Sequence, residues 1–265
     1  MRTFGFVLLS TLPILAAETQ PSQQQIDEII QKFAAKEAEF AKARASYTYR
    51  QTARVLDLDP SGNTLGKWEE TVDIQFTPEG RRFEKVVRAP VATLVSFQMD
   101  PGDLQDLRTT QPFVLTTAEL PNYHVRYLGK QKIDEIETYV FAVKPKRLEP
   151  DKRYFSGQVW VDDRDLQIVK SYGRGVGLQK GNQDHQYPKF ETYREQVDGK
   201  YWFPTYTIAN DTLHFKESDA RIRQIVRYED YKQFKAESKI TFGETVDDKK
   251  DEKKDEKKPP VKKQP

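Results

Sequence analysis

The spacing of the apolar residues changes once along this chain, and the change limits the fold more than any other feature. Over residues 23–45 the apolar residues recur at the three- and four-residue intervals of a helix face: Ile26, Ile29, Ile30, Phe33 and Phe40. Ser22 and Gln25 fit a capping box at its start. From Tyr47 onward apolar and polar residues alternate, as in a half-buried strand. The sequence predicts one long amphipathic helix and then a β-rich body.

The β-rich body is expected to hold about ten strands joined by short loops. The first two surround the turn at 59–63 and span residues 47–55 and 68–76. Further strands are expected at 81–88, 92–98, 123–129, 135–144, 153–162, 165–172, 187–197, 201–209 and 220–234. Short loops between successive strands favour an antiparallel order. A short helix is expected at 101–108, with Asp100 as its cap.

These elements predict a mainly β (α+β) fold, in which a single curved antiparallel sheet of about ten strands forms an unclosed barrel. The N-terminal amphipathic helix and the short helix are expected to cover the concave face. Two helices are too few to cover so large an apolar surface, so part of the concave face should remain as a ligand groove. A closed barrel or a two-sheet sandwich would remove the groove, and the sequence leaves both open.

The two ends of the chain are predicted to lie outside this fold. Residues 1–17 combine Arg2, an apolar run and a final Ala-Ala pair, which is typical of a signal peptide cleaved near Ala17. Because the chain has no cysteine, we expect an exported protein without a lipid anchor. Residues 247–265 are mostly Lys, Asp and Glu and should form a disordered tail that touches a membrane or cell wall at most weakly. The folded domain is then 18–246.

Composition and motifs exclude several classes of function. The 43 basic and 41 acidic residues nearly balance, which argues against nucleic acid as a partner. The low mean hydropathy excludes a multi-pass membrane protein. The three histidines, His124, His185 and His214, show no metal-ligand spacing, and serine-nucleophile motifs are absent. The acidic group at 162–165 fits a turn better than a calcium loop, and the glycines at 173–177 lack the spacing of a phosphate cradle. We therefore predict a protein that is not an enzyme and has no metal and no cofactor.

The predicted groove needs apolar residues from the helix and from several strands. Aromatic strand residues are mostly core residues, and a subset is expected to contact a ligand. The candidate groove residues are Ile30, Phe33, Tyr49, Phe76, Phe141, Trp160, Trp202 and Tyr206. Arg50 and Arg54, on the first strand, are the candidate polar contacts.

Read together, four segments resemble the LolA-like outer-membrane lipoprotein-sorting proteins. They are YLGKQKIDEIETYVFAVKPK (127–146), GQVWVDDRDLQIVKSYG (157–173), VDGKYWFPTYT (197–207) and RQIVRYEDYKQF (223–234). The resemblance covers about 23–241 and rests on the pattern of strands. It implies an open β-barrel with helices over an apolar cavity, and a soluble periplasmic carrier of acyl chains or lipoprotein lipid anchors for outer-membrane sorting. An inner-membrane release complex and an outer-membrane acceptor are the implied partners.

Two departures from the family keep other functions open. The family's cavity arginine aligns only loosely with Arg50 or Arg54, and the WFP segment and the charged tail differ from the best-known carriers. A different lipid cargo is one alternative. An envelope-stress sensor that binds a protein partner through the same fold is another, and a hydrolase using His124 or His214 is a third with little support.

Overall fold

The computed structural model describes residues 20–77, 81–178, 187–215 and 218–233. The chain divides into two units, Met1–Phe234 and Lys235–Pro265, and the described residues all belong to the first. The predicted signal peptide, its cleavage site, the boundary at 246, the tail and His185 lie outside them.

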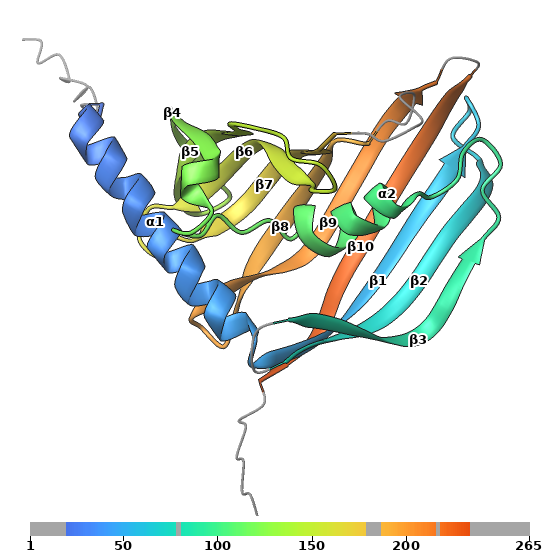
Figure 1. Ribbon diagram of the computed structural model, residues 1–265, viewed down its shortest axis with the longest axis horizontal. Helices are drawn as coiled ribbons and strands as arrows, with labels where there is room; N and C mark the ends of the chain where they lie inside the picture. Colours follow the sequence, from blue (N-terminus) through green and yellow to red (C-terminus); the bar gives the residue numbers. More distant parts are fainter. Residues whose placement is uncertain (1–19, 78–80, 179–186, 216–217, 234–265) are drawn as a thin grey trace, which may run out of the picture. The chain divides into compact units, whose positions relative to one another are not determined.

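One sheet organises the described part of the chain (Figure 1). The elements in chain order are α1 (Gln23–Arg44), β1 (Tyr47–Leu58), β2 (Thr64–Phe76), β3 (Arg82–Ala92), α2 (Pro101–Gln105), the π-helix η1 (Asp106–Thr110), the 3-10 helix η2 (Leu120–Asn122), β4 (Tyr123–Ile133), β5 (Ile136–Pro145), β6 (Tyr154–Asp162), β7 (Ile168–Val176), β8 (Phe190–Val197), β9 (Tyr201–His214) and β10 (Asp219–Gln233). The ten strands form one antiparallel sheet in the order β3-β2-β1-β10-β9-β8-β7-β6-β5-β4. The predicted fold class, a mainly β unclosed sheet with few helices, is confirmed.

The sheet is open because its two edge strands, β3 and β4, do not pair with each other. They are consecutive in the chain, and residues 93–122 between them run across the concave face, as the position of α2 in Figure 1 shows. This linker carries three buried apolar residues, Leu107, Phe113 and Leu115, into the interior. It therefore covers the concave face together with α1.

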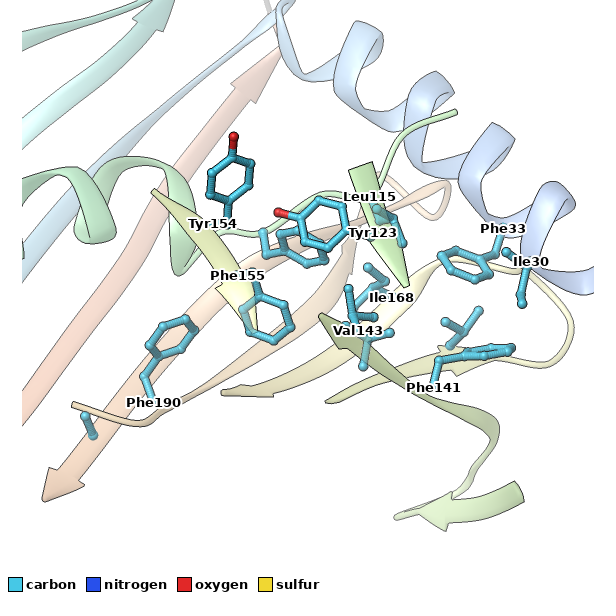
Figure 2. Packing of buried hydrophobic residues seen from close by; sticks show 14 residues of the cluster. Ile30, Phe33, Leu115, Tyr123, Phe141, Val143, Tyr154, Phe155, Ile168 and Phe190 are labelled. Atoms are coloured by element: carbon cyan, nitrogen blue, oxygen red, sulfur yellow. The ribbon is translucent and has the colours of Figure 1, made fainter. Parts of the chain in front are cut away.

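α1 begins where the sequence predicts. The Ser22 side chain accepts a hydrogen bond from the backbone N–H of Gln25, and the Gln25 side chain accepts one from the N–H of Ser22. The apolar face of α1 then packs on the part of the sheet that contains β5, where Phe33 lies against Phe141 with ring centroids 5.2 Å apart (Figure 2). Further along the helix, Phe40 meets Phe203 edge to face at 5.0 Å. These contacts bury the apolar face that the helix could not leave in water.

A buried ion pair joins α1 to the sheet between these two aromatic contacts. Glu37 is 0% exposed and Arg194 on β8 is 5% exposed, and an Arg194 Nη lies 3.2 Å from the Glu37 carboxylate. The backbone N–H of Ile168 donates to the same carboxylate, and Arg194 donates to the carbonyl of Phe113 in the linker. Burial raises the pKa of Glu37, and the charge of Arg194 opposes that rise. One helix, two strands and the linker thus meet at one pair of charges.

The linker is held by a second buried pair. Asp106 in η1 lies 2.5 Å from Arg153, and both side chains are 7% exposed. Asp106 sits directly over Gly175 of β7, where an added methyl group would overlap the carboxylate. Burial raises the pKa of Asp106 against the opposing hydrogen bonds from Arg153. The close approach of η1 to the sheet thus requires a glycine at 175.

Two predicted elements need correction or adjustment. Residues 92–98 are not a strand, apart from Ala92 at the end of β3. Val95 and Ser96 donate their backbone N–H groups to the Asp57 carboxylate instead of to a neighbouring strand. The helix expected at 101–108 is confirmed as α2, capped by Asp100, and it continues into the π-helix η1. The acidic group at 162–165 is a turn, in which Asp162 accepts the N–H groups of Arg164 and Asp165.

The Glu37–Arg194 pair gives a stability prediction. Glu37→Gln leaves Arg194 buried without a counter-charge, so the free energy of unfolding should fall by about 3 kcal/mol. The matched control is Glu39→Gln on the same helix, because Glu39 pairs with Lys36 at 2.9 Å where both side chains are about half exposed. That control should change the free energy of unfolding by less than about 0.5 kcal/mol. Urea unfolding measures both, and equal effects would show that the buried pair does not hold α1.

Candidate binding site

A cavity of about 460 Å³ lies where the C-terminal end of α1, the first three strands and the linker meet. Its lining also includes Tyr123 of β4 and Phe155 of β6, which belong with Phe113 to the apolar cluster under the start of α1. The lining residues are Ala41, Arg44, Tyr49, Phe76, Arg82, Arg108, Thr109, Thr110, Pro112, Phe113, Val114, Thr116, Glu119, Tyr123, Arg153 and Phe155. Aromatic rings and arginines dominate this lining, so the cavity is suited to a ligand with both an apolar and a polar part.

The aromatic part of the lining is rigid because its rings pack on one another. Phe113 from the linker stacks on Phe155 of β6 with ring centroids 4.5 Å apart, and Tyr123 meets Phe113 edge to face at 5.8 Å. On the opposite side, Tyr49 stacks on Tyr231 at 4.9 Å. Tyr123 is buried, and this raises its pKa to about 12, so the phenol is neutral at ordinary pH.

Three of the four arginines in the lining have carboxylate partners. Arg108 donates to both oxygens of Glu84, at 3.0 and 3.1 Å, and Arg82 pairs with the same carboxylate. Burial alone would raise the pKa of Glu84, but its hydrogen bond from Arg108 and the charge of Arg82 hold it below its usual value. Arg153 has Asp106 as its partner.

Arg44 differs from the other three. In the part of the chain that the structure describes, no carboxylate pairs with it and none of its nitrogens makes a hydrogen bond, and its Nε is shielded from solvent. Its guanidinium lies over the rings of Phe40 and Phe76, 5.7 and 5.4 Å from the centroids. Burial lowers the pKa of Arg44, and the nearby positive charges of Arg194 and Arg82 add to this effect. The cavity wall therefore contains an uncompensated cation.

The structure separates the candidate groove residues into three groups. Tyr49 and Phe76 line the cavity. Ile30, Phe33 and Phe141 are buried in the packed core between α1 and the sheet, and none of them borders the cavity. Their contact with a ligand stays a prediction.

The third group lies on the other face of the sheet. Val159 and Val161 pack under α1, so Trp160 between them points the opposite way, where it clusters with Val140 and Val169 and packs against Trp202. Tyr206 alternates in the same way with the inward-facing Thr207, and its ring lies 5.8 Å from Arg227. These three aromatic residues are remote from the cavity because strand alternation directs them outward.

Arg50 and Arg54 also point outward. Each alternates with the buried residues Tyr49, Gln51 and Ala53 of β1 and pairs across the outer face with an acid of β2. Arg50 lies 2.8 Å from Asp73, and Arg54 lies 2.5 Å from Glu69. The polar contacts of the cavity are therefore different arginines from the predicted ones.

The sequence contains a signal for the residues that the prediction missed. Glu37 falls four positions after Phe33 and three before Phe40, and Arg44 falls four after Phe40. Both charged residues thus continue the apolar stripe of α1 that faces the sheet, where burial makes a charge costly unless it is paired. Arg194 likewise lies on the buried side of β8, which it shares with Phe190 and Thr192. A charged residue at a position where the helix or strand pattern expects an apolar one therefore indicates a buried charge.

A second cavity, of about 780 Å³, lies on the other side of Arg153, which lines both. Its walls are the segment 96–105 and parts of the chain around Asp151, Leu178, Tyr187 and Phe215. The Arg153 guanidinium lies 3.6 Å from the Tyr187 ring centroid and so separates the two spaces.

Among the described residues, no group of three or more His, Asp or Glu side chains is placed to hold a metal ion. No helix in the described part of the chain is both long and apolar enough to span a bilayer.

The unpaired cation gives a second stability prediction. Arg44→Met keeps the length and apolar stem of the side chain and removes a charge that has no counter-ion, so the free energy of unfolding should rise by about 1 kcal/mol. For a domain of this size that is about 2–4 °C in Tm. Lys42→Met, at an exposed position in the same helical turn, is the control and should leave Tm nearly unchanged. A clear fall in Tm for Arg44→Met would mean that Arg44 has a structural role.

No family model matches the chain, and no curated protein matches it. Among solved structures it is similar to a DUF1329 family protein from Desulfovibrio piger, with 10% identity, a TM-score of 0.41 and coverage of 77% of this chain and 91% of that one. It is also similar to a LolA superfamily protein from Nitrosomonas europaea, with 13% identity, a TM-score of 0.36 and coverage of 77% and 94%. An outer membrane lipoprotein-sorting protein domain from Vibrio parahaemolyticus matches with 12% identity, a TM-score of 0.34 and coverage of 75% and 91%. The family that the sequence resembles is thus represented among the structural neighbours.

Proposed function

We propose that this protein is an exported carrier that binds an acyl chain or a lipoprotein's lipid anchor in the 460 Å³ cavity under the end of α1. The observation that carries the proposal is the cavity itself, an unfilled space on the concave face with aromatic walls. Its volume lies in the range of about 300–1,000 Å³ that is common for small-molecule sites. Burial of an acyl chain contributes about 0.8 kcal/mol per CH₂, so even part of one chain would supply useful affinity.

Binding rather than catalysis is the activity we propose for this site. The lining offers arginines, tyrosines and threonines but no histidine, and its one carboxylate, Glu119, is exposed. General acid–base work commonly uses a histidine or a buried carboxylate close to the reacting group. A carrier needs only a cavity and a way to open it, and the linker over the concave face is the segment that we expect to move.

The cellular setting of the proposal comes from the sequence. The signal peptide predicted at 1–17 supports a setting in the periplasm. A membrane complex that loads the carrier and an acceptor that unloads it would be its partners. The alternative role, a sensor of envelope stress that binds a protein through the same fold, predicts a stoichiometric protein partner in place of a lipid.

A cavity-filling variant tests the carrier proposal. Ala41 of α1 lines the cavity, so Ala41→Trp should occupy it and weaken binding of a fluorescent fatty acid at least tenfold. Ala35→Trp, on the exposed side of the same helix, is the matched control and should bind like the unchanged protein. Fluorescence titration measures both affinities, and a circular dichroism melt confirms that both variants fold.

Three results would separate the functions. Native mass spectrometry of freshly purified protein should show bound lipid that Ala41→Trp lacks. Protein that carries no lipid and ignores fatty acids and a synthetic triacylated lipopeptide would contradict the carrier proposal. A stoichiometric protein captured under the same conditions, without lipid, would favour the sensor.

A further inference from the structure

The charges around the cavity do not balance, and the imbalance lies at one residue. Two buried or part-buried carboxylates, Glu84 and Asp106, pair with three of the four arginines in the lining, and the exposed Glu119 also lines the cavity. Glu84 forms ion pairs with Arg82 and Arg108, and Asp106 forms an ion pair with Arg153. The nearest buried carboxylate on α1, Glu37, is bound by Arg194 and by the Ile168 N–H. Arg44 receives none of these carboxylates.

A guanidinium with free terminal nitrogens is a strong anion receptor. Arg44 makes no hydrogen bond within the described residues, although two ring faces fix its position. The Arg82 Nε atom, in the same lining, is also buried and unpartnered. A buried donor without a partner costs stability, which an anionic ligand would recover through charge-assisted hydrogen bonds.

The cations lie close to an apolar region. Phe76 contacts Arg44 on one side and belongs to the apolar cluster of β1 and β2 on the other. Phe113 and Phe155, which stack on each other, line the same cavity. A ligand that satisfied both surfaces would have an anionic group beside Arg44 and a hydrocarbon part against the aromatic rings.

We infer that the cavity selects anionic single-chain amphiphiles, with Arg44 binding the carboxylate or phosphate of the head group. This inference rests on the proposed carrier function and names its ligand class. It favours a free fatty acid or a lysophospholipid-type phosphate over a lipoprotein's lipid anchor, whose ester and amide linkages carry no full charge. The carboxylate and the phosphate share the chemistry that Arg44 recognises, which is a planar or tetrahedral set of anionic oxygens.

The test compares head groups on one chain length. The full mature chain is titrated calorimetrically with dodecanoate, dodecyl phosphate and dodecanol at one salt concentration. At least one anionic amphiphile should bind at least tenfold more tightly than the alcohol, since a hydrogen bond to a charged group is worth about that factor or more. The tighter anion identifies the head group, carboxylate or phosphate.

Two variants connect the preference to Arg44. Arg44→Gln should lower the affinity for the tighter anion at least tenfold and leave that for dodecanol within about threefold. Arg50→Gln removes an arginine from the outer face and should change neither affinity. A thermal melt confirms that Arg44→Gln folds.

The outcomes of these titrations test the preference for an anionic head group separately from the proposed carrier function. Equal binding of acid and alcohol, or a preference that survives Arg44→Gln, overturns the inference and leaves the carrier function standing. Failure of all three amphiphiles to bind overturns both. A preference for the anion that is lost in Arg44→Gln and kept in Arg50→Gln supports the inference.

Discussion

The arrangement of the concave face depends on the ion pair between Glu37 and Arg194. A pair of charges with almost no solvent contact is unfavourable unless each charge has several partners, so the surrounding backbone must be placed to supply them. The Ile168 N–H and the Phe113 carbonyl do so from β7 and from the linker. The pair therefore fixes the rotation of α1 and the path of the linker together. Arg44 is two helical turns further along the same face and is directed inward as a result.

The concave face has two halves with different tasks. Under the first part of α1, Phe33, Phe141 and their neighbours form a cluster of buried apolar residues (Figure 2). Under the last turn of α1 the interior contains arginines and a cavity. The apolar cluster attaches the helix to the sheet, and at the last turn of the helix Arg44 has no carboxylate partner among the described residues.

The sequence indicates the elements well and the site poorly, for physical reasons that particular residues illustrate. The stripe of α1 and the Ser22 cap are local patterns, and they predict the helix correctly. Trp160 and Trp202 looked like groove residues because their strands carry apolar residues on both faces, and alternation alone cannot tell an inner from an outer face. The sequence places Arg50 and Arg54 on the first strand, but their side chains lie on its outer face and pair there with acids of β2. The partners of Glu37 and Arg44 come from distant parts of the chain, and no local pattern contains that information.

The strand order also determines when the molecule can be completed. β1 and β10 lie side by side as the third and fourth strands from the β3 edge of the sheet, so the first and last strands of the described chain pair with each other. Until residues 219–233 are available, β1–β3 and β4–β9 are two separate groups of hairpins with no shared ladder. Loop closure over so many residues is slow. A chain still emerging from a ribosome therefore lacks the strand that joins these two groups until residues 219–233 have emerged.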